Sequence, residues 1–281
     1  MEARALISAD GTETLSGHAG AVPWWSFTKT VLAIAAVRLV EAGRLSLNAP
    51  LDGKPYTLAQ LLKHEAGLPD YGGLAAYHAD VAAGATPWPV ERLLAEAEAD
   101  RLRYPPGEGW AYSNIGYREV GQLVARAAGL TLGEALRDLV FAPAGLDGPR
   151  LALTQQDLAE VEMGGAPDYH PGWVYHGLVV GTVLDAARLL RALVDGRLVR
   201  FETMLDRRAL PEHRSALHPD PAYGLGLMLS ATDPLARPLG HTGGGPGSSF
   251  AAYMRDGRVV AVWADEASGL DATTEAFAAL T

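Results

Sequence analysis

The sequence contains no cysteine among its 281 residues, and lysine occurs only at Lys29, Lys54 and Lys63. Without cysteine the protein has no disulfide framework, no thiol nucleophile and no cysteine-ligated zinc site. Long apolar runs are also missing, because the most hydrophobic stretch, Val31 to Val40, is about half of what a bilayer crossing needs and contains Arg38. We therefore expect no membrane span.

Acidic residues outnumber basic ones, 33 to 23. The formal net charge is -10 and no run of basic residues is present, which argues against a nucleic-acid partner. The first residues, Met1-Glu2-Ala3-Arg4, carry an acid where a secretion signal needs positive charge, so a cytoplasmic location is expected. A hydrophobic content of 48% with 20% charged residues is typical of a folded protein with a sizeable core. Nothing in these patterns indicates an oligomeric state.

Strand patterns lie at the two ends of the chain and helix patterns lie between them. Asp10-Gly11 and Asp256-Gly257 each suit the positive φ angles of a type I′ turn, so each predicts a hairpin. The expected strands are Ala3 to Ser8, Thr12 to Gly17, Tyr223 to Ser230, Ser249 to Arg255 and Arg258 to Asp265. The expected helices are Thr30 to Ala42, Thr57 to Gly67, Ile115 to Ala128, Thr131 to Val140, Thr182 to Val194 and Asp271 to Leu280.

This order of elements predicts an α+β fold. Hairpins join neighbouring antiparallel strands, so the two chain ends are expected to form one antiparallel sheet with flanking helices. The mainly helical middle is expected to form an inserted lobe. In this division residues 1–22 and 216–281 make the sheet lobe, and residues 23–215 make the helical lobe. The cleft between the two lobes is the expected place for an active site.

Ser26 and Lys29 form the first candidate catalytic pair, at the start of the first expected helix. Residues three apart are neighbours on a helix, so the lysine amine is expected within reach of the serine hydroxyl. A lysine loses its proton when it is desolvated, whereas arginine does not, so this pair suits a serine nucleophile with its own base. The alternative is that Ser26 caps the helix and Lys29 is a solvated residue of the first turn.

Tyr112 and Asn114 form the second candidate, on a loop that follows the turn-forming segment Tyr104 to Gly109. A phenol beside a protonated lysine ionises more readily and can pass protons, and a carboxamide offers both a donor and an acceptor to a substrate amide. The alternative is a packed tyrosine followed by a helix cap at Ser113 or Asn114.

The glycine-rich segment Gly240 to Gly247 is the third candidate. Glycine at this density exposes backbone N–H groups and lets a ligand approach the chain closely, as an oxyanion hole requires. His241, within the segment, belongs to the residue type that titrates near neutrality and is a candidate anchor for a substrate carboxylate. The alternative is a flexible loop with an incidental histidine.

Together the three motifs resemble the serine β-lactamase and penicillin-binding-protein superfamily, and the resemblance covers most of the chain. The tyrosine of the second motif is similar to the class C β-lactamases and their relatives, which are D-alanyl-D-alanine carboxypeptidases, D-amino-acid peptidases and family VIII esterases. The motifs are Ser26-x-x-Lys29, Tyr112-x-Asn114 and His241-Thr242-Gly243.

The resemblance implies catalysis through an acyl-enzyme. Ser26 would be the nucleophile, and Lys29 and Tyr112 would move the proton between the nucleophile and the leaving group. Asn114 would orient the substrate amide. The backbone N–H groups of Ser26 and Gly244 would form the oxyanion hole.

The third motif departs from the pattern most typical of β-lactamases. His241 stands in the place of a lysine, which is more similar to the carboxypeptidase and D-peptidase branch. With Thr242 and Gly243 it would bind the substrate from the opposite wall. The resemblance therefore implies a serine hydrolase of a small ester, amide or D-amino-acid peptide, with slow turnover of β-lactams. The alternatives are a true β-lactamase and a catalytically silent module that binds a peptide or acyl group.

No cofactor or metal is expected, because Lys29 can supply the base and no histidine pair has the spacing of a metal hydrolase. Asp70-Tyr71 is predicted to be a turn. The remaining histidines are expected to be surface or packed residues, and they are His18, His64, His78, His170, His176, His213 and His218.

Overall fold

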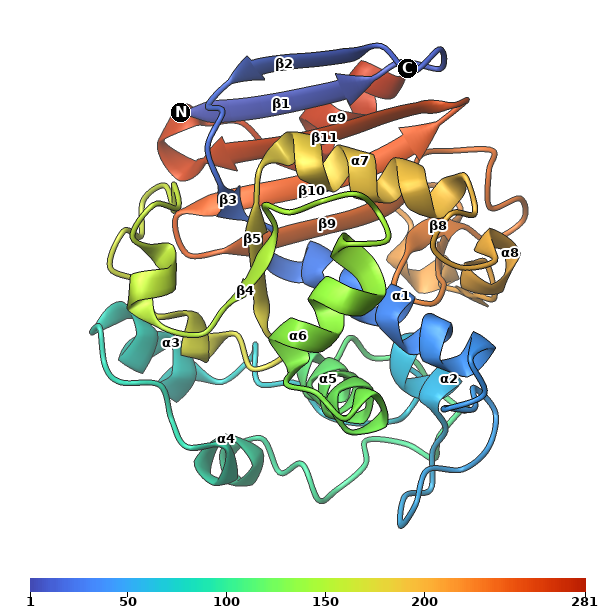
Figure 1. Cartoon of the computed structure of the whole chain (residues 1–281). Coiled ribbons are helices and arrows are strands. Elements are labelled where there is room, and N and C mark those ends of the chain that lie inside the picture. Colours follow the sequence, from blue (N-terminus) through green and yellow to red (C-terminus); the bar gives the residue numbers. More distant parts are fainter.

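A computed structural model describes residues 1–281 and shows an α+β fold, as predicted. Both chain ends contribute to one eight-stranded antiparallel sheet with helices on its two faces, and a second group of helices lies below it (Figure 1). The strand order is β2 (Glu13–Gly17), β1 (Glu2–Ile7), β11 (Arg258–Asp265), β10 (Ser248–Arg255), β9 (Leu239–Gly245), β8 (Met228–Ser230), β7 (Pro221–Tyr223) and β6 (Arg208–Ala209).

The C-terminal hairpin has the expected turn, whereas the N-terminal hairpin does not. Asp256 and Gly257 both have positive φ, at 50° and 73°, between paired strands β10 and β11. Of Asp10 and Gly11, only Gly11 has positive φ, and its N–H donates to the carbonyl of Ser8. The pairing of Ile7 with Glu13 leaves five residues in the connection, so a two-residue type I′ turn is wrong there.

The strand expected from Tyr223 to Ser230 is interrupted, and β7 and β8 lie on either side of the break. Gly226, with φ 73°, packs against the first long helix, where an added Cβ would lie 2.6 Å from Cβ of Ala33. Its carbonyl also accepts a hydrogen bond from Oγ1 of Thr30 at 2.7 Å. Contact with this helix therefore overrides the local strand pattern.

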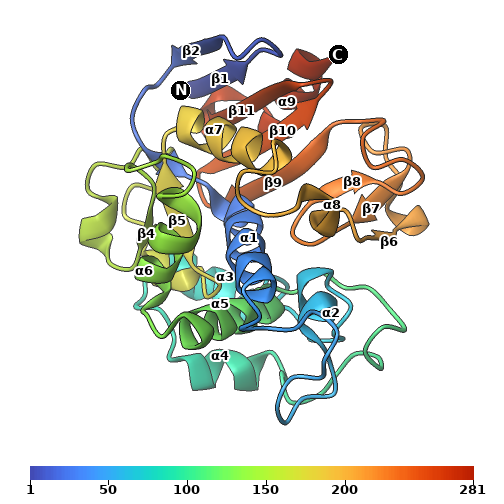
Figure 2. The same ribbon diagram turned by 45° about the vertical axis from the view of Figure 1, so that its right-hand side comes forward.

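Helix α1 (Thr28–Glu41) runs through the middle of the molecule, between the sheet and the second helical group (Figure 2). Its residues are buried on nearly every face, and Gly43 with φ 70° ends it as predicted. Beside it lies α5 (Asn114–Ala128). The position of α1 brings the 3-10 turn that precedes it, Trp25–Phe27, close to β9 of the sheet.

Two short helices follow their predicted starts, and one of them stops before its predicted end. Capping boxes at Thr57 and Thr131 are both formed. The first of these helices stops at Leu62 rather than Gly67, because His64 has a positive φ of 61° that no helix continues through. These two helices are α2 (Leu58–Leu62) and α6 (Leu132–Leu136), which continues as a π-helical turn over Arg137–Phe141. Three further short helices were not predicted, and they are α3 (Ala75–Ala82), α4 (Val90–Glu96) and α8 (Phe201–Met204).

Two helices cover the two faces of the main sheet. Alternate residues of β10 and β11 pack into the main core or against α9 (Ala272–Leu280). On the other face α7 (Val183–Val194) contacts β1, β10 and β11. The division into a sheet lobe and a helical lobe stays a prediction, and α7, from within the range assigned to the helical lobe, packs on the sheet. A small second sheet has the order β3 (Val22–Pro23), β5 (Leu178–Gly181), β4 (Arg150–Ala152). No helix has both the length and the apolar character needed to cross a bilayer.

Candidate active site

Ser26 lies in a short 3-10 turn, Trp25–Phe27, that leads directly into α1. The residue before it, Trp25, has a φ of 42°, which is strongly disfavoured for a bulky side chain and is typical of a constrained functional turn. The indole N–H of Trp25 donates to Oγ of Ser248 at 3.1 Å, so strand β10 holds the turn in place. Ser26 is thereby presented with its side chain partly exposed.

Lys29 is completely buried one turn further along α1, which excludes a solvated lysine at this position. Its Nζ lies 3.2 Å from Oγ of Ser26 and 2.7 Å from Oδ1 of Asn114. Burial lowers the pKa of Lys29 to about 7, while attraction to the Asp70 carboxylate opposes the shift. Near pH 7 a large share of the amine is therefore neutral and able to accept a proton.

Asp70 fixes the orientation of Asn114 at the start of α5. Oδ1 of Asp70 accepts the backbone N–H of Asn114 at 2.8 Å, and Oδ2 of Asp70 lies 3.4 Å from the side-chain Nδ2 of Asn114. The amide nitrogen therefore faces Asp70, and the amide oxygen faces Lys29. Asp70 also accepts the N–H of Gly72, as in the predicted turn. The sequence indicated that turn but not the contact of Asp70 with Asn114, because the two residues are 44 positions apart.

Tyr112 is half-buried beside Ser26 and Lys29. The lysine Nζ lies 4.8 Å from the centre of the tyrosine ring, and Ser26 is close enough to the tyrosine to influence its pKa. Burial raises the pKa of Tyr112 above its ordinary value. This corrects the expectation that a neighbouring ammonium would make the phenol ionise more readily. The hydroxyl stays protonated at neutral pH and is available as a donor.

The glycine-rich segment forms the end of β9 and the turn into β10. Gly245 and Ser248 flank the two-residue turn, so they form a hydrogen-bonded pair. Hydrogen-bonded and non-hydrogen-bonded pairs alternate along antiparallel strands, so the next pair, Gly244 and Ser249, is not hydrogen-bonded. The N–H of Gly244 therefore points away from β10. The first hydrogen bond of the 3-10 turn is donated by the N–H of Phe27 to the carbonyl of Trp24. The N–H of Ser26 comes before it and therefore has no partner within the turn.

Gly243 allows β9 to approach the Ser26 turn closely. An added Cβ at this position would lie 2.7 Å from the backbone nitrogen of Ser26 and 2.8 Å from Cβ of Trp25. Any larger residue would therefore push the strand and the turn apart. The glycine acts through this close packing and does not line the cavity beside Ser26.

His241 and Thr242 lie outside that cavity as well. His241 is completely buried, with Nε2 2.8 Å from the hydroxyl of Tyr223 and Nδ1 2.5 Å from the carbonyl of Thr242. Burial lowers the pKa of His241 to about 3, so the ring is neutral at physiological pH. This corrects the expectation of a cationic anchor for a substrate carboxylate. The hydroxyl of Thr242 donates to the carbonyl of Phe250 and also hydrogen-bonds to the hydroxyl of Thr273 in α9.

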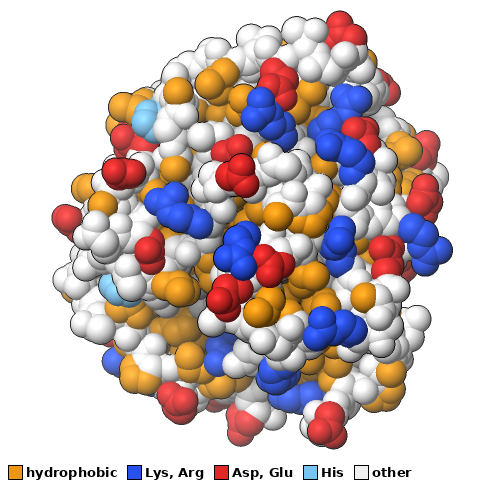
Figure 3. All heavy atoms as spheres, in the orientation of Figure 1, with side chains coloured by type: hydrophobic (Ala, Val, Ile, Leu, Met, Phe, Trp, Pro, Cys, Tyr) orange, Lys and Arg blue, Asp and Glu red, His pale blue; other side chains and the backbone are white.

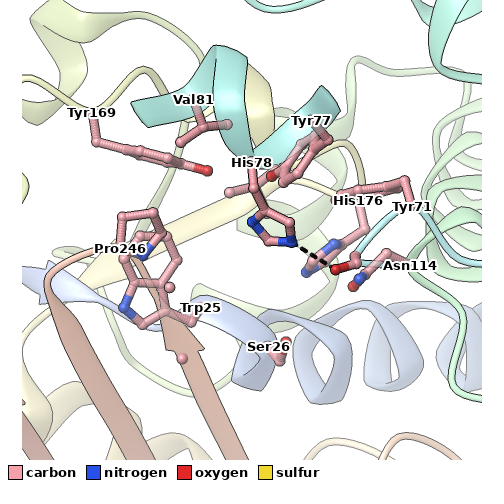
Figure 4. A pocket seen from close by; sticks show the side chains of 14 residues that line it. Trp25, Ser26, Tyr71, Tyr77, His78, Val81, Asn114, Tyr169, His176 and Pro246 are labelled. Atoms are coloured by element: carbon pink, nitrogen blue, oxygen red, sulfur yellow. Dashed lines mark hydrogen bonds between the residues drawn. The ribbon is translucent and has the colours of Figure 1, made fainter. Parts of the chain in front are cut away.

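A cavity of about 180 Å³ opens beside Ser26, with no lysine, arginine, aspartate or glutamate among its lining residues. Figure 4 shows Trp25, Pro246 and Tyr169 on one side of Ser26 and His176, Tyr71 and Asn114 on the other. The wall is largely aromatic and apolar. Its apolar and aromatic members are Trp25, Tyr71, Tyr77, Val81, Tyr169, Val174 and Pro246.

Two histidines expected to be surface or packed residues are buried next to the catalytic candidates. His176 is 4% exposed, lines the cavity and places Nε2 3.2 Å from Nζ of Lys29. His64 stacks on Tyr112 with ring centres 4.3 Å apart, and its Nδ1 accepts the N–H of Ser113. No sequence pattern indicates either contact, since His176 is 147 residues from Lys29. No group of three or more His, Asp or Glu side chains is placed to hold a metal.

Comparison with known proteins identifies a matching family and several similar proteins. The family model described as Beta-lactamase matches residues 19–280. Penicillin-binding protein 4* of Bacillus subtilis is 27% identical over 256 residues, which cover 80% of this chain and 55% of that protein. Lovastatin esterase of Penicillium rubens is 29% identical over 280 residues, which cover 74% of this chain and 69% of the esterase. The chain therefore spans about half the length of the first relative.

Solved structures show the same fold. The D-amino acid amidase of Ochrobactrum anthropi, crystallised with L-phenylalanine amide, superposes with a TM-score of 0.76 at 21% identity. The match covers 93% of this chain and 85% of the amidase.

Proposed function

Because the chain belongs to the beta-lactamase family, we propose that it is a serine hydrolase that cleaves an ester or amide through an acyl-enzyme on Ser26. The observation that carries this proposal is the buried amine of Lys29, 3.2 Å from the serine hydroxyl and with a pKa of about 7. A lysine in this state is a suitable general base, because its pKa lies close to the working pH.

In the proposed reaction Oγ of Ser26 attacks the substrate carbonyl while its proton passes to the neutral amine of Lys29. Tyr112, protonated and beside Ser26, then supplies a proton to the leaving group, and the ammonium of Lys29 restores the tyrosine proton. Asn114, held by Asp70, orients the substrate and the lysine together. Water later hydrolyses the acyl-enzyme and frees Ser26.

The backbone N–H groups of Ser26 and Gly244 are the proposed oxyanion hole. Both residues line the cavity, and neither N–H is used by the secondary structure around it. Two such donors stabilise the negative oxygen of the tetrahedral intermediate, and removal of one donor in other hydrolases costs roughly 3 to 4 kcal/mol.

The substrate proposed for this site is a neutral ester, amide or D-amino-acid peptide with an apolar or aromatic acyl group. The cavity walls are aromatic and carry no formal charge, and His241 is neutral. An esterase and an amidase are among the similar proteins, which fits both bond types. β-Lactams are proposed to turn over slowly, because they carry a carboxylate for which the cavity offers no lysine or arginine.

Labelling of Ser26 is the direct test of this proposal. A fluorophosphonate probe is expected to add one equivalent of mass to the wild-type protein and none to Ser26→Ala, and that variant should lose ester hydrolysis by several orders of magnitude. The small, partly exposed side chain contributes little to packing, so its melting temperature should stay unchanged. Activity of Ser26→Ala within about tenfold of wild type would refute the assignment. Binding of substrates without any covalent labelling would instead favour a silent binding module.

A further inference from the structure

The amine of Lys29 has three hydrogen-bonding neighbours, of which the Ser26 hydroxyl can either donate or accept. Oδ1 of Asn114 lies at 2.7 Å, Nε2 of His176 at 3.2 Å and Oγ of Ser26 at 3.2 Å. Oδ1 of Asn114 is an acceptor because the amide nitrogen faces Asp70. His176 is the neighbour for which the proposed reaction has no role so far.

The protonation state of His176 decides what its Nε2 can do. Burial, together with the charge of Lys29, lowers the pKa of His176 well below its ordinary value, so the ring is neutral. A neutral ring has one N–H and one lone pair. Since an ammonium on Lys29 can only donate, the lone pair lies on Nε2 and the hydrogen on Nδ1.

Valence then fixes the direction of the neutral lysine amine. A neutral amine has two N–H groups and one lone pair, and the two acceptors, Asn114 and His176, take both N–H groups. The lone pair is left facing the third neighbour, the hydroxyl of Ser26. With only one acceptor present, the amine would be free to rotate its lone pair away from the serine.

We propose that His176 is a positioning residue for Lys29, whose Nε2 accepts one amine N–H and thereby turns the amine lone pair toward Oγ of Ser26. This inference rests on the proposed role of Lys29 as the base. In the step it supports, the O–H bond of Ser26 breaks, its proton joins the lone pair of Nζ, and the oxygen forms the new bond to the substrate carbonyl carbon. The carbonyl π electrons move to the oxygen held by the oxyanion hole.

A second observation supports a functional reason for this histidine. Its Nδ1 is buried and has no hydrogen-bond partner in the protein, which costs stability. A histidine kept only for packing gains nothing from such an atom, and an apolar residue of similar size would avoid the cost.

The test compares His176→Gln with His176→Leu. Glutamine can place a side-chain oxygen close to the position of Nε2, whereas leucine has no acceptor. We expect acylation of Ser26 by p-nitrophenyl butyrate, measured as the burst of p-nitrophenolate, to be slowed at least tenfold in His176→Leu and to recover most of the wild-type rate in His176→Gln. The control is His18→Leu, which removes another histidine with an unpaired ring nitrogen, located at the sheet edge against Trp263.

The pH profile separates positioning from a structural role. A hydrogen-bond acceptor stabilises the ammonium form of Lys29 and so raises the lysine pKa. Loss of the acceptor in His176→Leu should therefore move the acid limb of the acylation rate to lower pH, and the acceptor in His176→Gln should move the limb back. If His176→Leu fails to fold, His176→Asn replaces it, because the shorter amide does not reach Lys29. Equal rates and equal pH profiles in the acceptor-bearing and acceptor-free variants would overturn the inference, while wild-type labelling at Ser26 would still support the proposed function. An absence of labelling in the wild type would overturn both.

Discussion

The buried amine of Lys29 is the residue-scale feature on which the proposed chemistry depends, and its pH dependence is a first prediction. The amine is a base only when neutral, and its pKa is about 7. The value of kcat/KM for a neutral ester should therefore rise about tenfold per pH unit below pH 7 and level off above it. A profile that is flat from pH 5 to pH 9 would contradict Lys29 as the base.

The same prediction extends to Asp70. Its carboxylate favours the ammonium form and so raises the pKa of Lys29 against the larger effect of burial. Asp70→Asn removes the charge, keeps an oxygen for the Asn114 N–H, and should therefore move the acid limb below pH 7. Asp52→Asn, at an exposed position, is the control that should leave the limb in place. A limb displaced to higher pH would contradict the attraction between Asp70 and Lys29.

Tyr112 gives a second prediction, which depends on the leaving group. Its raised pKa makes it a proton donor rather than a phenolate base. p-Nitrophenolate leaves as an anion and needs no proton, whereas an alkoxide or an amine does. Tyr112→Phe should therefore slow the hydrolysis of alkyl esters and amides by about two to three orders of magnitude, and that of p-nitrophenyl esters much less. Equal losses for both kinds of substrate, in parallel kcat/KM measurements, would argue against this role.

Some of these site residues could be predicted from the sequence, and others could not. Ser26 and Lys29 share one helical turn, so their proximity followed from local geometry. Asp70 and His176 reach the site only through the tertiary fold, and no local pattern marks them. The charge state expected for His241 was wrong because burial, which lowers its pKa, is set by neighbours far along the chain.

Among the elements, predictions succeeded where local signals act alone. The end of α1 at Gly43, the capping boxes and the C-terminal turn all depend on a few adjacent residues. They failed where a tertiary contact competes with the local pattern, as at Gly226, where packing on α1 breaks a strand. Strands of two or three residues, such as β3 and β6, are too short to show any periodicity and were not expected.

The contact between β9 and the Ser26 turn leads to a third prediction. Gly243→Ala places a methyl group 2.7 Å from the backbone nitrogen of Ser26, so either the strand or the turn must shift. Misplacement on this scale costs about a hundredfold in rate, with a loss of roughly 1 to 3 kcal/mol in the free energy of unfolding. Ester hydrolysis and urea unfolding would measure the two effects. Gly73→Ala, with no atom within 4 Å of the added methyl group, should change neither, and wild-type activity in Gly243→Ala would show that the close approach is unimportant.

At the scale of the whole molecule, the sheet joins the two ends of the chain, with β1 paired to β11. The two predicted hairpins made this arrangement the most economical one, so the α+β fold could be predicted without knowledge of long-range contacts. The order of the remaining strands and the packing of α7 on the sheet could not, because they depend on how buried faces fit together.

The charge of the molecule and of its cavity leads to the last prediction. The net charge is -10, and on the face shown in Figure 3 basic and acidic side chains are interspersed, so no basic patch there attracts an anion. Within the cavity no lysine or arginine is available, and the His241 ring is neutral above its pKa of about 3. A substrate carboxylate would therefore be desolvated without a lysine or arginine as partner, which is costly.

We expect p-nitrophenyl phenylacetate to be hydrolysed with a kcat/KM at least about tenfold higher than the same ester with a carboxylate on the phenyl ring. The ratio should stay constant from pH 6 to pH 8, because the titration of Lys29 affects both esters equally and His241 does not titrate there. His78, the exposed histidine of the cavity wall, is expected not to bind the carboxylate, because its Nε2 is hydrogen-bonded to the carbonyl of Gly72 at 2.7 Å. A ratio that changes through this range in favour of the carboxylate at low pH would show that a histidine cation binds the substrate. A preference for the charged ester, or for a chromogenic cephalosporin, would show instead that the protein uses a cation outside this cavity and is a carboxypeptidase or a true β-lactamase.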